Sequence, residues 1–119
     1  MKNHFLLLFV LATTGATLSN CEKIKMDKNV PACIKERIKS IEKEKIWNPA
    51  AKIFQYEYKG KTVFYIPSHC CDIPGEVLDE NCNLICQPDG GITGKGDGKC
   101  KDFFKERTGE KLIWADTRK

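Results

Sequence analysis

Cysteine content constrains the fold of this chain more than any other feature of its sequence. Seven cysteines occur within 119 residues: Cys21, Cys33, Cys70, Cys71, Cys82, Cys86 and Cys100. So many cysteines in a short chain are typical of an oxidising compartment, where disulfides stabilise a core that is small for its surface. The odd number indicates that one cysteine has a role other than pairing.

The first 20 residues predict export. Lys2 precedes a continuous apolar run over residues 5–12, and small residues follow, which is the layout of a secretory signal peptide. The run is shorter than the roughly 20 residues of a membrane-spanning helix. A buried N-terminal helix is the other interpretation, and it lacks the expected polar face and cap. We therefore expect a signal peptide over residues 1–20.

The end of this segment, LSNC at residues 18–21, resembles a bacterial lipobox. The resemblance implies cleavage before Cys21 and attachment of acyl chains such as palmitate, although Asn20 departs from the commoner Gly or Ala. Each buried CH2 contributes about 0.8 kcal/mol, so two or three chains anchor a domain to a membrane. Residues 21–29 would form the lipid-anchored tether. The alternative is an ordinary signal peptide cut nearby, which leaves Cys21 as a free or paired thiol.

The six cysteines after Cys21 are sufficient for three disulfides, and they allow fifteen pairings. Neighbouring side chains of an extended segment point to opposite faces, so we expect Cys70 and Cys71 to join two different bridges. Their candidate partners are Cys82 or Cys86, and Cys33 or Cys100.

Periodicity predicts one helix and two hairpins in a single cysteine-rich domain over residues 30–119. Ile34, Ile38 and Ile41 form one apolar stripe on a helix that ends before the sequence WNP at residues 47–49. Aromatic residues alternate with polar ones over 54–58, and a Lys-Gly turn leads into a β-rich segment over 62–66.

The second half of the chain contains shorter elements. Residues 77–78 and 84–86 flank a turn-rich segment and predict a second hairpin. A glycine-rich loop follows, then a short helix over 101–109 closed by Gly109, then a terminal strand over 111–116. The fold class is therefore α+β, with one helix packed on an antiparallel meander of about four strands. The C-terminal aromatic residues Phe103, Phe104 and Trp114, or a partner, would cover the other face of the sheet.

The glycine loop is the candidate ligand site. Its candidate residues are Gly90, Gly91, Thr93, Gly94, Lys95 and Asp97. The pattern lacks the G-x4-G-K-[ST] motif of a phosphate-binding loop. Long ordered loops often carry function, but an omega-like loop whose glycines avoid strain is the alternative interpretation.

Metal and redox chemistry have weaker signals, and we expect no metal and no cofactor. Adjacent cysteines rarely chelate one zinc ion, and the chain contains no C-x-x-C. The D-x-N-x-N spacing that starts at Asp79 is similar to the beginning of an EF-hand, but neither the sixth-position glycine nor the twelfth-position glutamate is present. His69 and Asp72 are the residues on which an enzymatic activity would depend, and we expect none.

Three segments together are similar to an uncharacterised domain of small cysteine-rich bacterial lipoproteins. They are the CCD at residues 70–72, the D-x-x-C-N-x-I-C at 79–86 and the GG-x-TGKGDG loop at 90–98. The resemblance spans roughly residues 31–116. It implies an exported, lipid-anchored domain and no known activity.

The sequence therefore predicts a structural or binding module of the cell envelope, on the periplasmic or cell-surface side. Its partners would be the membrane, through the lipid, and an envelope protein. The alternative is a small inhibitor of a hydrolase such as a protease or lysozyme, with the glycine loop as the inserting element. The net charge of +4 is mild and no basic stripe is interleaved with aromatic residues, so a nucleic-acid partner is not expected.

Overall fold

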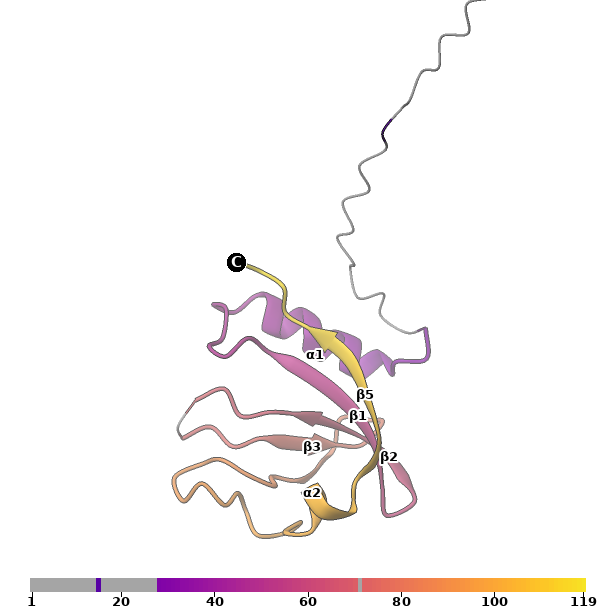
Figure 1. The fold of residues 1–119 in the computed structure, drawn as a ribbon, viewed down its shortest axis with the longest axis vertical. Helices are drawn as coiled ribbons and strands as arrows, with labels where there is room; N and C mark the ends of the chain where they lie inside the picture. Colours follow the sequence, from indigo (N-terminus) through magenta and orange to yellow (C-terminus); the bar gives the residue numbers. More distant parts are fainter. Residues whose placement is uncertain (1–14, 16–27, 71) are drawn as a thin grey trace, which may run out of the picture.

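The computed structural model describes residues 15, 28–70 and 72–119 (Figure 1). The predicted signal peptide apart from Gly15, the lipid site at Cys21, most of the tether and Cys71 lie outside the described residues. None of the described helices has the length and apolar character needed to cross a membrane.

Two helices and five strands form the described part of the chain. In chain order they are α1 (Ala32–Glu42), β1 (Lys52–Tyr58), β2 (Lys61–Ile66), β3 (Glu76–Leu78), β4 (Leu84–Cys86), α2 (Phe103–Glu106) and β5 (Thr108–Ala115). The strands form one antiparallel sheet in the order β4-β3-β2-β1-β5. The predicted α+β class is confirmed. The sheet has one strand more than the four expected, because β5 pairs along the outer edge of β1.

Helix α1 lies along one face of the sheet (Figure 1). Ile34, Ile38 and Ile41 are all buried on the side of the helix that faces the strands, and they share a hydrophobic core with Ile53 and Phe64. Fully burying a side chain of this size stabilises the fold by about 1.5–3 kcal/mol, so this stripe is a main source of stability.

The β1–β2 hairpin divides its aromatic residues between the two faces of the sheet. Phe54 lies opposite Tyr65, and Tyr56 lies opposite Val63, so these four side chains share one face. Phe64 points to the other face and contacts the α1 side of the core. The aromatic residues of this hairpin therefore contribute to two hydrophobic cores, one on each face of the sheet.

The second face is covered by α2 and by the loop that leads into it. Phe103 is fully buried there, and its ring centroid lies 5.3–5.8 Å from those of Tyr56, Tyr58 and Tyr65. Such edge-to-face and tilted arrangements are the favoured geometry of aromatic pairs. The sheet thus lies between α1 on one side and the C-terminal segment on the other.

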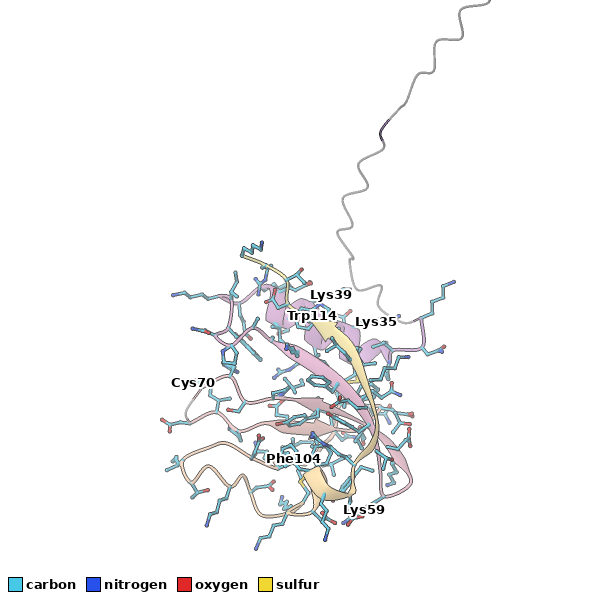
Figure 2. The ribbon with its side chains drawn as sticks, viewed as in Figure 1. Lys35, Lys39, Lys59, Cys70, Phe104 and Trp114 are labelled. Carbon is cyan, nitrogen blue, oxygen red and sulfur yellow. A yellow bond between two sulfur atoms is a disulfide. The ribbon has the colours of Figure 1, made fainter. Side chains whose placement is uncertain are left out.

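Trp114 lies on a different face from the one the sequence suggested. It pairs with Ile53 across β5 and β1 and belongs to the core on the α1 side. Figure 2 shows Trp114 near α1 and Phe104 on the opposite side of the sheet. The prediction for Trp114 is wrong because residue alternation along β5 depends on its register with β1, which the sequence alone does not specify.

The C-terminal elements also differ from the prediction of a helix over residues 101–109. Helix α2 ends at Glu106, and β5 begins at Thr108. Gly109 lies inside the strand with a φ of 64°, close to a register shift between Gln55 and Glu57 of β1. A strand that starts this early pairs with β1 over most of its length, and this pairing outweighs a short helical signal.

Two disulfides join described residues. Cys33–Cys82 connects α1 to the turn between β3 and β4, and Cys86–Cys100 closes the loop between β4 and α2. One bridge therefore fixes the helix to the sheet, and the other constrains the glycine loop.

The prediction that Cys70 and Cys71 pair with Cys82 or Cys86 and with Cys33 or Cys100 is wrong. All four candidate partners are already paired, Cys33 with Cys82 and Cys86 with Cys100. The topology explains part of this result. Ile66 pairs with Glu76, so the connection that carries Cys70 lies at one end of β2 and β3, while Cys82 lies in the turn beyond the other end of β3.

Candidate functional site

The glycine loop, residues 87–99, contains the six residues that the sequence singles out for ligand binding. Its two arms are hydrogen-bonded to each other. The backbone N–H of Asp97 donates to the carbonyl of Gln87 (2.9 Å), and that of Gly96 donates to the carbonyl of Gly90 (3.0 Å). With the disulfide at its base, the loop is a closed and internally supported unit.

Polar side chains of the predicted ligand loop are used to hold the loop itself. The carboxylate of Asp97 accepts hydrogen bonds from the backbone N–H groups of Gln87 (3.1 Å) and Lys99 (2.9 Å). The hydroxyl of Thr93 accepts one from the N–H of Lys95 (3.2 Å). The structure therefore brings the predicted residues together, but most of their polar groups satisfy one another instead of facing a ligand.

Glycine is required where the loop approaches other backbone. At Gly96 (φ 68°), a Cβ atom would lie 1.9 Å from the carbonyl oxygen of Gln87. At Gly90 (φ 72°), it would lie 3.0 Å from the carbonyl oxygen of Ile73. These contacts and the positive φ angles exclude larger residues, so the loop conformation depends on these two glycines.

Ile92 is the residue that the loop presents to solvent. The backbone N–H of Gly94 donates to the carbonyl of Gly91 (3.2 Å), which places Ile92 second in a tight turn at the apex. Its side chain is 92% exposed, more than any other large hydrophobic residue described. Sequence reasoning missed Ile92, although it is the one branched aliphatic residue between Gln87 and Lys99.

All three tyrosines of the chain make the same kind of contact, and that of Tyr65 attaches the base of the loop. Each donates its hydroxyl to a carboxylate: Tyr56 to Glu110 (2.5 Å), Tyr58 to Asp102 (2.5 Å) and Tyr65 to Asp89 (2.9 Å). Burial, together with the hydrogen bond to Glu110, raises the pKa of Tyr56 to about 12. Burial and the bond to Asp89 also raise the pKa of Tyr65, and this bond attaches the loop to β2.

The stretch SHCCD does not assemble a catalytic triad from its described residues. The hydroxyl of Ser68 donates to the carbonyl oxygens of Cys70 (3.1 Å) and Ile73, so it stabilises the turn. His69 stacks on an indole ring from the α1–β1 connection, and Asp72 is exposed. Within the described ranges, no group of three or more His, Cys, Asp or Glu side chains is placed to hold a metal ion.

The calcium-like spacing at Asp79 forms a capped turn. The carboxylate of Asp79 accepts hydrogen bonds from the backbone N–H groups of Asn81 (2.8 Å) and Asn83 (2.9 Å) and from the side-chain amide of Asn83 (3.1 Å). The backbone hydrogen bond from Asn83 is the main cause that lowers the pKa of Asp79. Its oxygens are therefore already occupied by the turn between β3 and β4.

Comparison with known proteins gives one match. The family model DUF6970, described as a domain of unknown function, matches residues 39–116, which include the sheet, the glycine loop and the last turn of α1 with Ile41. Comparisons with curated proteins and with solved structures gave no match.

Proposed function

Because this chain belongs to the DUF6970 family, whose description names no activity, we propose from its structure that it is a binding module of the cell envelope. A lipid on Cys21 holds it to a membrane, and the glycine loop inserts Ile92 into an apolar cavity of a protein partner. The observation that carries this proposal is the almost complete exposure of Ile92 at the apex of a loop with a supported conformation.

The loop is organised before it meets a partner. Its hydrogen bonds and its disulfide restrict the backbone, and its glycines permit the positive φ angles of that conformation, so binding need not order a flexible segment. Ordering costs are a main reason why buried area does not convert into affinity, and a pre-organised loop avoids much of that cost. An exposed branched aliphatic residue on such a loop is therefore suited to insertion.

The small size of the apex favours a protein cavity over a lipid surface. Full burial of one isoleucine contributes about 1.5–3 kcal/mol. Even a myristoyl chain, with many more CH2 groups, gives only marginal membrane binding. In a protein cavity, the contacts of the surrounding surface add to the burial of the apex.

Charged residues of both signs surround the loop. The exposed lysines on the loop and on the adjoining α2 region are Lys95, Lys99, Lys101 and Lys105. Asp89 and Asp97 keep their negative charge while they accept hydrogen bonds, and Glu106 of α2 is exposed. A partner whose rim complements this mixed pattern would gain mainly in the rate of association and in specificity.

The second candidate function is inhibition of an envelope hydrolase, such as a protease or lysozyme. The convex shape of the Ile92 turn favours it, because an active-site cleft is a concave surface that such a turn can enter. In this case the partner is the enzyme itself, and binding blocks access to its substrate cleft.

A crosslinking experiment tests the binding proposal. The lipidated protein, expressed in its native envelope, would carry a photo-crosslinking residue at position 92 or, as the control, at the exposed Thr117. We expect one identified protein to crosslink from position 92 and not from position 117. Unmodified protein should compete for that crosslink, whereas the Ile92→Asp variant should not. Crosslinks to lipid alone, or equal competition by Ile92→Asp, would contradict the proposal.

Two further measurements separate the parts of the proposal. Intact mass spectrometry of protein from the native envelope should show acyl chains on Cys21. An unmodified thiol at this position would contradict the proposed lipid anchor. Activity assays with purified lysozymes and serine proteases test the inhibitor. Inhibition lost in Ile92→Asp supports it, and full activity of every enzyme at saturating protein argues against it.

A further inference from the structure

Two neighbouring hollows lie where the α1–β1 connection meets the end of β2. Both are lined by Trp47, Pro67 and His69, and their volumes are about 280 and 250 Å³. The rings of Trp47 and His69 stack with centroids 3.6 Å apart and an interplanar angle of 16°. The stacked pair is thus a shared wall of both hollows.

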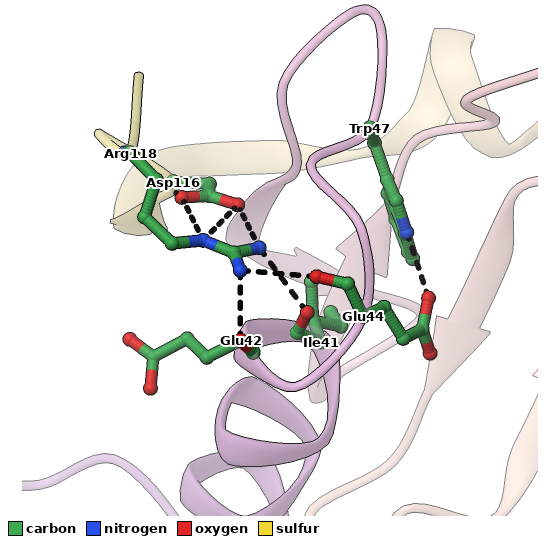
Figure 3. A network of polar contacts seen from close by, with 6 residues as sticks. All are labelled: Ile41, Glu42, Glu44, Trp47, Asp116 and Arg118. Carbon is green, nitrogen blue, oxygen red and sulfur yellow. Dashed lines mark hydrogen bonds and ion pairs between the residues drawn. The ribbon is translucent and has the colours of Figure 1, made fainter.

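Trp47 is held in place by contacts that reach the C-terminus (Figure 3). Its indole N–H donates to the carboxylate of Glu44 (2.8 Å), and the backbone carbonyl of Glu44 accepts from Arg118 (3.0 Å). Arg118 also donates to the carbonyls of Ile41 and Glu42 at the end of α1. This network fixes an aromatic ring that stands in an irregular connection.

The first hollow has apolar walls. Besides the stacked pair, its lining includes Pro49, Ala51, Phe54 and Pro67. A hollow of this size accommodates a six-membered ring, and the surrounding side chains match a ligand face made of C–H groups. Binding sites of this kind are mainly apolar and use a few polar groups to fix orientation.

The second hollow supplies those polar groups. Arg37, Glu44 and Glu76 line it together with His69. Arg37 donates through Nη2 to Glu76 (3.2 Å), and Glu44 accepts from Trp47, so each charged group is paired within the fold, while the buried Nε of Arg37 has no partner among the described residues. A ligand with a net charge would disturb these pairs, whereas hydroxyl groups can add to them as both donors and acceptors.

We infer that the two hollows bind a neutral pyranose sugar. Its C–H face lies in the apolar hollow, and its hydroxyl groups reach Glu44, Glu76 and Arg37 in the second. A proline-rich peptide fits less well, because its carbonyls need donors and the indole N–H of Trp47 is already donated to Glu44. The site goes beyond the proposed protein-binding function, and neither hollow is lined by a residue of the glycine loop.

Titration with defined sugars tests this inference. The probes are the trisaccharides of N-acetylglucosamine, β-linked glucose and α-linked glucose, added to the processed protein in a detergent that carries no sugar headgroup. We expect at least one to bind with a Kd on the order of 0.1–10 mM, which is usual for a small polar ligand. In NMR spectra, the Trp47 indole and His69 ring signals should shift, while the buried Trp114 indole should not.

Variants connect the binding to the stacked pair. Trp47→Ala should weaken the binding roughly tenfold, which corresponds to about 1.4 kcal/mol, because it removes the aromatic wall that both hollows share. Phe104→Ala, an aromatic truncation on the other side of the sheet, should leave it unchanged. If Trp47→Ala does not fold, His69→Ala removes the stack with a smaller change. The inference is overturned if no trisaccharide binds at 20-fold the highest expected Kd, if Trp47→Ala and His69→Ala both bind as the parent does, or if a triproline peptide binds more tightly than every sugar.

Discussion

Replacing Arg118 with alanine should destabilise the protein more than its position near the C-terminus suggests. Arg118 lies next to Asp116, whose side chain is 1% exposed, and the Nη2–Oδ2 distance is 2.7 Å. The guanidinium also donates to the backbone carbonyls of Ile41 and Glu42 at the end of α1 and of Glu44 just beyond it (Figure 3). The substitution therefore removes the counter-charge of a buried carboxylate and a cap of the helix at once.

The magnitude follows from the burial of the two partners. Breaking a fully buried ion pair costs about 3–5 kcal/mol, because one charge remains buried without compensation. Arg118 is 34% exposed, so water can partly replace it at Asp116, and we expect a loss of about 3 kcal/mol. For a domain of this size that change lowers Tm by roughly 12 °C or more.

Chemical unfolding followed by circular dichroism measures this loss. The set consists of the parent, Arg118→Ala, Asp116→Asn and the double variant. Asp116→Asn removes the buried charge, so the double variant should be about 2 kcal/mol more stable than the sum of the two single effects predicts. A loss below about 1 kcal/mol in Arg118→Ala, or single effects that add within about 0.5 kcal/mol, would refute the reasoning.

The pH dependence of the same variants provides an independent check. The hydrogen bonds from Arg118 lower the pKa of Asp116 in the folded protein. A carboxyl whose folded pKa is lowered contributes stability that is present above its unfolded pKa of about 3.9 and is lost as the pH falls through the folded value. The difference in stability between the parent and Arg118→Ala should therefore be full at neutral pH and should shrink as the pH falls below about 4. A difference that stays constant down to pH 2 would mean that Asp116 is not the group concerned.

Other predictions concern the tyrosines and the glycine loop. In an absorbance titration at 295 nm, native tyrosines should ionise well above the usual pH of about 10, with Tyr56 near pH 12, and the stability that their raised pKa values provide should be lost as the pH rises above about 10. Titration at the ordinary pKa would contradict their burial. Gly96→Ala should cost more than 3 kcal/mol by chemical unfolding because its Cβ would meet backbone, whereas Gly94→Ala, with open space, should cost only about 1 kcal/mol. Equal losses would contradict the close approach. Removing the Cys86–Cys100 bridge by double alanine substitution should cost about 3 kcal/mol and increase hydrogen exchange in the loop, and unchanged exchange would show that the hydrogen bonds alone hold it.

Local patterns in the sequence predicted the elements whose formation depends on neighbouring residues. The apolar stripe of α1 and the alternation in the first hairpin describe each element almost completely, because helix and strand periods act over a few residues. The second hairpin was also predicted from its flanking apolar pairs and its turn. These elements determine the α+β class.

Predictions failed where a residue's environment depends on a distant segment. The register of β5 against β1 decides which face Trp114 occupies, and these strands are more than 50 residues apart in sequence. The partner of Cys33 likewise depends on the turn that contains Cys82 being placed over α1. Spacing within the sequence carries no information about either arrangement, so the fifteen possible disulfide pairings could not be reduced to the observed one.

The sequence located the glycine loop and left two interpretations of its role open. Its glycines and the cysteine at its end were visible in the sequence, and they indicated a loop of special backbone conformations pinned at Cys100, but the pairing of Cys86 with Cys100 was not predicted. Its polar residues would serve a ligand in one interpretation, and in the other it is an omega-like loop whose glycines avoid strain. In the structure Thr93 and Asp97 accept hydrogen bonds from the loop's own N–H groups. Because the loop satisfies most of its own polar groups, the residue that it presents to a partner is the exposed Ile92.

The SHCCD turn connects the two candidate surfaces. His69 stands in the wall of both hollows, while Ile73, at the end of the same turn, approaches Gly90 at the base of the glycine loop. Ser68 donates its hydroxyl to the carbonyl of Ile73 and so makes the turn one unit. A ligand beside His69 and a partner at Ile92 would therefore be supported by the same short segment. If binding at one site alters the affinity at the other, Ser68→Ala should reduce that coupling. Because Ser68 also lines the first hollow, the affinity for each ligand alone is measured beside the coupling.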